Sequence, residues 1–187
     1  SRRGEPVGDR TMPVARPIHT VGIAICTLRR PEMLRDLLRS IAAQDVDRVR
    51  YRVSISVADN SPSTEGLAVV HSLAGVFPFP IEVDHEPTPG IAPTRNRSVR
   101  LLGPTDAVVF VDDDEVVKPD WLSRLLDTAE RFDADVVSGP VHARYETTVP
   151  GWVVAGRFHD KLGPATGTTT GATATCNLLV RRNIFEV

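Results

Sequence analysis

The chain has 187 residues, 41% of them hydrophobic and 25% charged, and a formal net charge of −2 at pH 7. These values are typical of a globular domain and exclude a disordered, collagen-like or coiled-coil protein. No apolar stretch reaches the roughly 18–20 residues that a membrane-spanning helix needs, and the slightly acidic balance disfavours nucleic-acid binding. The chain has two cysteines, Cys26 and Cys176, and so small a number predicts free thiols in the reducing cytoplasm. A single disulfide between the two is the alternative.

The first 19 residues differ from the rest of the chain. They combine arginine, proline and glycine without any apolar periodicity, and they lack the basic start and apolar run of a signal peptide. We therefore expect an N-terminal arm or leader over 1–19 and a single domain over 20–187. Because the chain starts at Ser1 and ends at Val187, just after two apolar residues, we expect both ends to be trimmed.

From Thr20 onward, stretches with strand periodicity alternate with stretches of helical periodicity. Such alternation predicts an α/β fold with a mostly parallel central sheet and helices on both faces. Ligands bind such sheets beyond the C-terminal ends of the strands. A Gly-, Thr- and Ala-rich stretch over 163–175 predicts a mobile loop. The expected strands are 21–26, 51–57, 81–84, 107–111, 135–141 and 176–180, and the expected helices are 31–41, 64–73, 94–102 and 119–132.

The strongest functional signal is a run of three aspartates, Asp112, Asp113 and Asp114, directly after the apolar strand 107–111. Adjacent like charges repel one another, and a divalent cation relieves that repulsion. Mn²⁺ and Mg²⁺ prefer hard oxygen ligands. On an extended segment, Asp112 and Asp114 converge on one side while Asp113 faces elsewhere. The alternative is a solvated acidic turn before the helix at Pro119.

Two weaker signals lie at other predicted strand ends. Asp59, after the strand 51–57, suits hydrogen bonds to a base or ribose, and its alternative role is to bond its own backbone in a turn. Gly90 permits close approach of a ligand to the backbone, and Arg95 suits a bidentate contact with a pyrophosphate. The alternative for Arg95 is an ordinary surface arginine on a helix.

Several short motifs follow one another in a fixed order: Val21-Gly-Ile-Ala-Ile-Cys-Thr27, Arg30-Pro31-Glu32-x-Leu34, Val57-Ala-Asp59-Asn-Ser61, Gly90 with Arg95-Asn96, Phe110-Val-Asp112-Asp-Asp114, Pro119-Asp-Trp-Leu122, Thr170-Gly171 and Asn177-Leu-Leu-Val-Arg181-Arg182. Together they resemble the inverting glycosyltransferases called family two. The resemblance covers about 20–185. It implies the GT-A fold, which is a Rossmann-like nucleotide-sugar-binding architecture.

The resemblance also implies roles for individual residues. It places Thr27 and Asp59 on the nucleoside, and Arg95 near the uracil or the diphosphate. It makes Asp112 and Asp114 the outer members of a DXD motif, with Asp114 as the direct metal ligand and Asp112 nearer the ribose. The resulting donor-binding set is Thr27, Arg30, Asp59, Arg95, Asp112 and Asp113, and the metal set, for Mn²⁺ or Mg²⁺, is Asp114 and Asp112.

The implied reaction is transfer of a sugar from a nucleoside-diphosphate sugar, with UDP-sugar favoured, to a carbohydrate or lipid-linked acceptor. The acceptor hydroxyl attacks the anomeric carbon in line, with inversion. Peripheral attachment to the inner membrane face is compatible with such an acceptor. Family members carry an acidic catalytic base shortly after the region that 177–185 matches, so we expect the base beyond Val187 and the domain to be truncated before it.

Three other classes of protein share some of these features. A sugar-nucleotide-binding module without catalysis shows the same motifs and lacks the base. A nucleotidyltransferase shares the fold and the metal, but its first strand usually leads into a glycine-rich loop, and Cys26-Thr-Leu-Arg-Arg-Pro31 contains no glycine. A phosphoacceptor signalling domain carries its acid pair after the first strand, where this chain has Cys26-Thr27. The sequence contains no His/Cys spacing typical of a zinc site.

Overall fold

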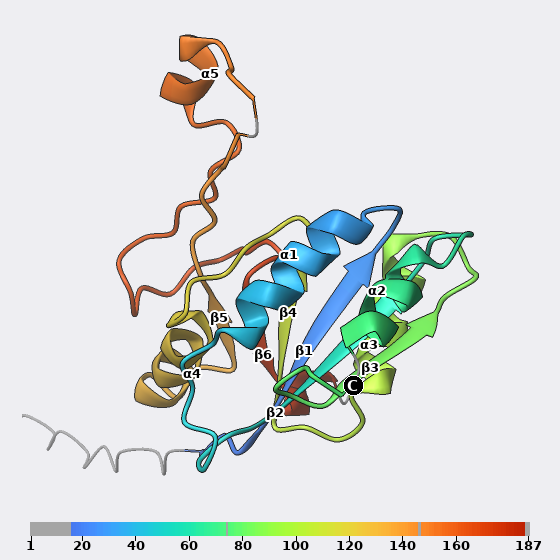
Figure 1. The fold of residues 1–187 in the computed structure, drawn as a ribbon. Coiled ribbons are helices and arrows are strands. Elements are labelled where there is room, and N and C mark those ends of the chain that lie inside the picture. Colours follow the sequence, from blue (N-terminus) through green and yellow to red (C-terminus); the bar gives the residue numbers. More distant parts are fainter. Residues whose placement is uncertain (1–15, 74, 146, 186–187) are drawn as a thin grey trace, which may run out of the picture.

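The computed structural model describes residues 16–73, 75–145 and 147–185. Within them, one mixed sheet runs in the order β3-β2-β1-β4-β6-β5 (Figure 1). The first four strands are parallel, whereas β6 is antiparallel to both of its neighbours. The predicted mostly parallel sheet is therefore confirmed. The strands are β1 (Thr20–Thr27), β2 (Arg52–Asp59), β3 (Ile81–His85), β4 (Ala107–Asp112), β5 (Val136–Ser138) and β6 (Leu178–Arg181).

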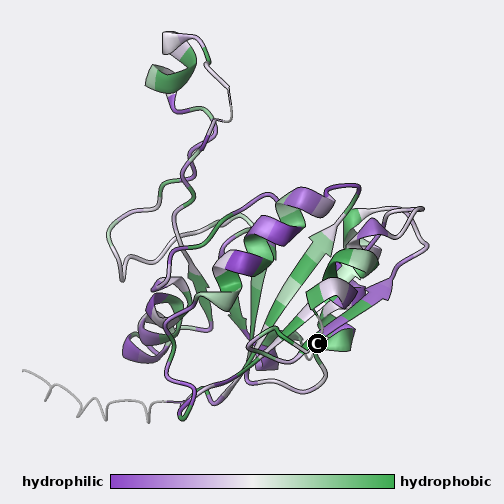
Figure 2. Cartoon of the chain, viewed as in Figure 1, coloured by the Kyte–Doolittle hydropathy of each residue, from purple (hydrophilic) through white to green (hydrophobic). Residues whose placement is uncertain are grey.

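Helices cover both faces of the sheet. On one face, α1 (Pro31–Ala42), α2 (Glu65–Leu73) and α4 (Trp121–Arg131) enclose the larger core, together with Val21, Ile23 and Ile25 of β1. On the other face, α3 (Ile91–Leu101) and the segment after it cover a smaller core around Ala24 and Phe110. Alternate residues of β1 thus enter different cores, as the two-residue period of a strand requires. The central strands β1 and β4 are accordingly apolar, whereas the edge strand β3 is largely hydrophilic, and the outer side of α1 is hydrophilic (Figure 2).

The amphipathic pattern of α1 and α4 explains where these helices form. In α1, Pro31 occupies the first turn, where its missing N–H costs no hydrogen bond. The four apolar residues predicted for its inner face are all buried, as are those predicted for α4: Leu34, Leu37, Leu38, Ile41, Trp121, Leu122, Leu125 and Leu126. Such burial of a helical stripe is the main source of helix stability in a protein.

Two predicted boundaries differ from the structure by three residues, whereas the others agree within two. The strand expected over 135–141 is only Val136–Ser138: Gly139 N–H still bonds to the carbonyl of Asn177 in register with β6, but Pro140 has no N–H to continue the ladder. The helix expected from Thr94 begins at Ile91, because Pro93 is tolerated in a first turn and Thr94 bonds back to the carbonyl of Gly90.

Residues 139–145 and 147–176 form a protruding hairpin between β5 and β6 (Figure 1). A backbone bridge joins Val141 to Lys161 at its base, and α5 (Gly151–Gly156) lies at its tip. The stretch 163–175 contains neither helix nor strand, so its loop assignment is confirmed. The chain then returns as β6 and ends in the 3₁₀ helix η1 (Arg182–Phe185).

The end of the predicted N-terminal arm contacts the domain. Ile18 is fully buried in the larger core, and Arg16 forms ion pairs with Asp133 and Asp135 at 3.0 and 2.9 Å. The preceding part of the predicted arm, residues 1–15, lies outside the described residues. No helix of the described residues is long and apolar enough to cross a membrane.

Candidate active site

The candidate site lies where three neighbouring strands end. The register pairs Thr27 of β1 with Asp59 of β2, and Cys26 of β1 with Asp112 of β4. Because these strands are parallel, their C-terminal ends meet at one edge of the sheet. The fold therefore brings together the polar residues that the sequence placed at separate strand ends.

Arg30 joins two members of the aspartate run to the end of β1. Its Nη1 donates to Asp113 Oδ1 at 3.1 Å and to Asp114 Oδ2 at 2.8 Å. The Thr27 hydroxyl donates to the other oxygen of Asp113 at 2.8 Å. Asp113 is buried, with 8% of its side chain exposed, whereas the side chain of Asp114 is 46% exposed. Asp113 thus holds Arg30 in contact with the carboxylate of Asp114.

Asp112 lies apart from this arrangement. Its side chain is 44% exposed, and its Oδ1 is 4.0 Å from Arg95 Nη2. The alternation that was expected to pair Asp112 with Asp114 ends at Asp112, because the chain turns there and Glu115 N–H donates to the Asp112 carbonyl at 3.1 Å. Arg30 consequently pairs with Asp113 and Asp114, while Arg95 approaches Asp112.

Burial and like charge shift the pKa values of two acids at this edge. Burial raises the pKa of Glu115 to about 7, and the nearby carboxylate of Asp112 adds to the effect. Burial also raises the pKa of Asp113, although the hydrogen bonds from Thr27 and Arg30 oppose it. Burial is the larger cause of both shifts, and the charge of Asp112 contributes further only at Glu115.

Asp59 is fully buried and directed at α2. Its carboxylate accepts from the N–H groups of Ser61, Gly66 and Leu67 at 2.8, 2.7 and 3.3 Å. A Cβ at Gly66 would lie 2.8 Å from this carboxylate, so glycine permits the close approach. An anion is favourable at a helix N-terminus. These contacts are those of the turn alternative, and the contact of Asp59 with a nucleoside stays a prediction.

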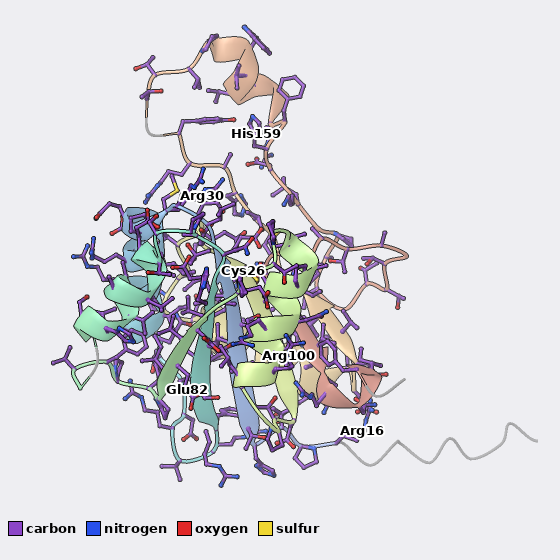
Figure 3. The ribbon with its side chains drawn as sticks, turned by 90° about the vertical axis from the view of Figure 1, so that its right-hand side faces the viewer. Arg16, Cys26, Arg30, Glu82, Arg100 and His159 are labelled. Atoms are coloured by element: carbon purple, nitrogen blue, oxygen red, sulfur yellow. The ribbon has the colours of Figure 1, made fainter. Side chains whose placement is uncertain are left out.

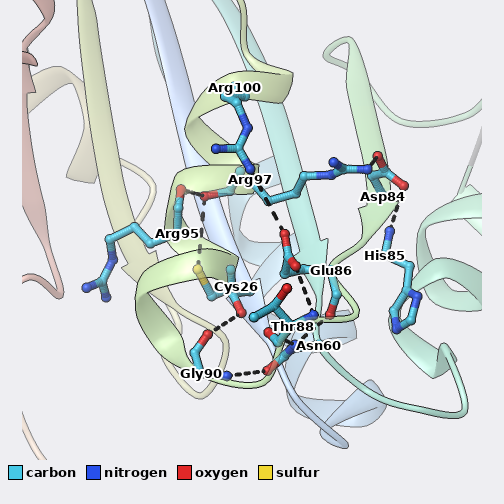
Figure 4. Close-up of polar contacts among 12 residues, drawn as sticks. Cys26, Asn60, Asp84, His85, Glu86, Thr88, Gly90, Arg95, Arg97 and Arg100 are labelled. Carbon is cyan, nitrogen blue, oxygen red and sulfur yellow. Dashed lines mark hydrogen bonds and ion pairs between the residues drawn. The ribbon is translucent and has the colours of Figure 1, made fainter. Parts of the chain in front are cut away.

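Asn60 fixes the loop that leads into α3 (Figure 4). Its Nδ2 donates to the carbonyls of Glu86 and Thr88 at 2.6 and 2.9 Å, and its Oδ1 accepts from Gly90 N–H at 3.1 Å. Gly90 has φ 127°, a conformation that strongly favours glycine. The start of α3, and with it Arg95, is thereby held next to the end of β2. Figure 4 shows Arg95 directed away from Arg97, which pairs with Asp84.

Lys161 of the hairpin also reaches this edge, although no sequence pattern indicates it. Its Nζ donates to Cys176 Sγ at 3.0 Å. The contact with Cys176, and at longer range the charges of Asp112 and Glu115, raise the pKa of the Lys161 ammonium. A long-range contact made by a loop leaves no periodicity in the sequence, so no pattern could have revealed it.

The donor set at this edge fits a hard divalent cation. Asp112 and Asp114 offer carboxylate oxygens that are nearly half exposed. No group of three or more His, Cys, Asp or Glu side chains is gathered as a complete metal site in the described part of the chain. Such an incomplete set matches Mg²⁺ chemistry, in which one or two carboxylates act together with phosphates of the substrate.

A sheet of this topology with an aspartate run at the end of β4 occurs in glycosyltransferases and in nucleotidyltransferases, so the similarity to known proteins decides between these two classes. The model of the family "Glycosyl transferase family 2" matches residues 22–187, and the chain belongs to that family. The chain is 41% identical over 164 residues to the succinoglycan biosynthesis protein ExoM of Rhizobium meliloti (strain 1021), which covers 87% of this chain and 52% of ExoM. The resemblance inferred from the motifs is confirmed.

A second curated relative is the glucosyl-dolichyl phosphate glucuronosyltransferase of Haloferax volcanii. It is 29% identical over 136 residues, which are 71% of this chain and 39% of that protein. The chain thus spans about half the length of ExoM, and less of the second relative.

Solved structures confirm the GT-A fold. S. aureus TarS in complex with UDP-GlcNAc matches with a TM-score of 0.56 and 21% identity, over 71% of this chain and 37% of TarS. The mannosyltransferase PcManGT of Pyrobaculum calidifontis, in complex with GDP-Man and Mn²⁺, matches with a TM-score of 0.58 and 20% identity, over 68% of this chain and 36% of that one.

Proposed function

We propose that this chain binds a nucleoside-diphosphate sugar, with a UDP-sugar favoured, at the C-terminal edge of β1, β2 and β4. The full protein transfers the sugar to an acceptor hydroxyl with inversion. The observation that carries the proposal is the pair of half-exposed carboxylates, Asp112 and Asp114, flanked by the guanidinium groups of Arg95 and Arg30. Membership of the family supports the class of reaction.

In this proposal, Asp114 and Asp112 would hold Mn²⁺ or Mg²⁺, and a cation held there would supply Lewis-acid stabilisation of the diphosphate leaving group. Arg30 and Arg95 supply positive charge on either side, and the buried carboxylate of Asp113 keeps Arg30 in place. Thr27 and Asp59, as the resemblance implies, lie toward the nucleoside. We assign no residue of 1–187 as the catalytic base.

The hairpin supports a lipid-linked acceptor and attachment at the inner membrane face. At its tip, Trp152 and Phe158 are 68% and 66% exposed, and their rings contact each other edge to face. Exposed aromatic side chains on a protruding element are typical of proteins that lie at a lipid–water interface. Lys161, at the base of the hairpin, bridges to Val141 through the backbone and donates to Cys176 through its side chain. The hairpin thus connects its tip to the edge of the sheet that carries the candidate site.

The test is a thermal-shift and calorimetric screen of UDP, GDP, CDP and TDP, each with and without Mn²⁺. A ligand at 100 times its Kd stabilises the folded state by about 2.7 kcal/mol. We expect UDP with Mn²⁺ to raise the melting temperature most. Asp114→Asn removes the Mn²⁺ effect and keeps the fold, whereas Asp127→Asn, on the exposed side of α4, retains it. If no nucleoside diphosphate binds with Mn²⁺ present, the proposal is wrong.

A further inference from the structure

A second pocket lies at the opposite end of the sheet from the candidate active site. Its volume is about 690 Å³, and Arg16, Thr105, Arg181 and Arg182 are among its lining residues. Arg181 pairs in register with Ala107, the first residue of β4, so the pocket lies at the N-terminal end of that strand. Figure 3 shows Arg16 and Arg30 at opposite ends of the sheet. The six residues of β4 separate the two ends by about 20 Å, at roughly 3.3 Å per residue.

Several residues that line this pocket carry buried polar atoms without a hydrogen-bond partner among the described residues. Among the described residues, five buried side-chain nitrogen or oxygen atoms lack a hydrogen-bond partner, and three belong to residues that line it: Thr105 Oγ1, Arg181 Nη2 and Arg182 Nη1. Buried polar groups are almost always hydrogen-bonded, so each exception calls for an explanation. The three unpartnered atoms come from two separate segments of the chain, and their residues line the same pocket. This coincidence indicates a single missing hydrogen-bond partner.

The pocket is set up for a negative charge. Arg181 is 4% exposed, and its Nε donates to the Ala134 carbonyl at 3.1 Å, which fixes the plane of the guanidinium. Its Nη2 is 4.0 Å from Asp133 Oδ1, beyond hydrogen-bond reach. The lining carboxylate of Asp106 already accepts from His19 N–H, Thr20 N–H and the Thr20 hydroxyl through Oδ2. The positive charge of the two neighbouring arginines is thus left without a hydrogen-bonded counter-ion among the described residues.

We propose that this pocket binds a phosphate group, either free in solution or in the headgroup of an anionic phospholipid. Planar guanidinium groups bind phosphate oxygens through paired N–H donors. A tetrahedral phosphate offers enough acceptor oxygens to meet two guanidinium groups and one hydroxyl together, whereas a carboxylate has two oxygens. The site is separate from the donor site and does not depend on the proposed transferase activity.

The experiment is calorimetric titration of the protein with inorganic phosphate at constant ionic strength. We expect saturable binding that Arg182→Gln weakens about tenfold or more, as befits the loss of a charged hydrogen-bond donor. Arg30→Gln, at the candidate active site, and Arg39→Gln, on the exposed side of α1, leave the affinity unchanged. Sedimentation with phosphatidylglycerol vesicles, against phosphatidylcholine vesicles, separates the two sources: vesicle binding that phosphate competes away and Arg182→Gln abolishes identifies the headgroup, and phosphate binding alone identifies a soluble phosphate.

Thr105→Val provides a second variant should Arg182→Gln fail to fold. It removes an unpartnered buried hydroxyl, so we expect the phosphate-free protein to be at least as stable as the original. Phosphate binding should weaken about three- to tenfold, the loss expected for one hydrogen bond. The proposal is overturned if neither phosphate nor vesicles bind saturably. It is equally overturned if Arg30→Gln abolishes phosphate binding while Arg182→Gln and Thr105→Val leave it intact, because the phosphate then occupies the active site.

Discussion

The layered body of the molecule and its protruding hairpin use apolar residues in opposite ways. In the body, formed by 16–73, 75–138 and 177–185, the large apolar cores lie between the sheet and the helices that cover it, and Leu122 and Leu126 of α4 are fully buried, although scattered apolar side chains such as Val49 and Val76 are exposed. In the hairpin, α5 contains no buried residue, and Trp152 and Phe158 are mostly exposed. Folding explains the first set of apolar residues. It does not explain the second, so function is the better reason for that set.

The largest expected effect tests this difference directly. Leu122→Ala should lower the free energy of unfolding by about 2–5 kcal/mol, because it leaves a cavity in the larger core. Trp152→Ala should change it by no more than about 0.5 kcal/mol, because the removed side chain contacts mostly solvent. Urea unfolding followed by circular dichroism measures both. A loss of 2 kcal/mol or more in Trp152→Ala would show that the hairpin packs against the body.

The same difference explains what the sequence could predict. The apolar run 107–111 and the stripe Leu34, Leu37, Leu38 and Ile41 each determine an element through local periodicity, and β4 and α1 form there. The antiparallel direction of β6 has no such local signal, because it depends on the path of the hairpin that precedes it.

The candidate site also combines features that the sequence predicts with features that depend on the path of the chain. Sheet topology alone gathers Thr27, Asp59 and Asp112 at one edge, so their proximity could be predicted. The partners of Arg30 and Lys161 could not, because they depend on how the chain turns after Asp112 and on where the hairpin returns. Motif spacing therefore locates a site more reliably than it assigns the contacts within it.

The next effect concerns the strand-end aspartate inside the body. Asp59→Ala leaves three N–H groups, those of Ser61, Gly66 and Leu67, without their acceptor, and should cost about 1–3 kcal/mol of stability. Asp59→Asn keeps one acceptor oxygen and should cost less. Urea unfolding measures stability, and calorimetry with UDP and Mn²⁺ measures binding. Unchanged stability combined with weakened UDP binding would assign Asp59 to the nucleoside and reject the structural role of its contacts.

A smaller effect on stability is expected from two cationic side chains near the aspartate run, Arg30 of the body and Lys161 of the hairpin. Arg30→Gln removes the charged partner of the buried Asp113 carboxylate, which keeps its hydrogen bond from Thr27, and should lower stability by about 1 kcal/mol, a value reduced by the exposure of Arg30. Lys161→Gln removes an exposed group whose hydrogen bond goes to Cys176, and should cost less than about 0.5 kcal/mol. Chemical unfolding at pH 7 measures both. The reverse order would mean that the hairpin, and not β1, organises the site.

The smallest effect on stability at neutral pH is expected from Cys26, near the end of β1. Burial raises the pKa of its thiol from 9.0 to about 11, although Arg95 and Ser98 oppose the shift. At pH 8 the folded protein therefore holds about 100-fold less Cys26 thiolate than the unfolded chain, and iodoacetamide should alkylate it more slowly by a similar factor. Because the unfolded thiol ionises first, stability is unaffected below about pH 9 and falls as the pH rises from 9 toward 11.

Peptide mapping by mass spectrometry follows the alkylation of Cys26 directly, with urea-unfolded protein as the reference for an unshifted thiol. Cys26→Ser should abolish the part of the alkaline loss of stability that this thiol causes, since a serine hydroxyl does not ionise in that range. Equal alkylation rates in folded and unfolded protein would show that Cys26 is open to solvent. The edge of the sheet at β1 would then be as exposed as the hairpin, and the distinction between a packed body and an exposed hairpin would not extend to the rim of the candidate site.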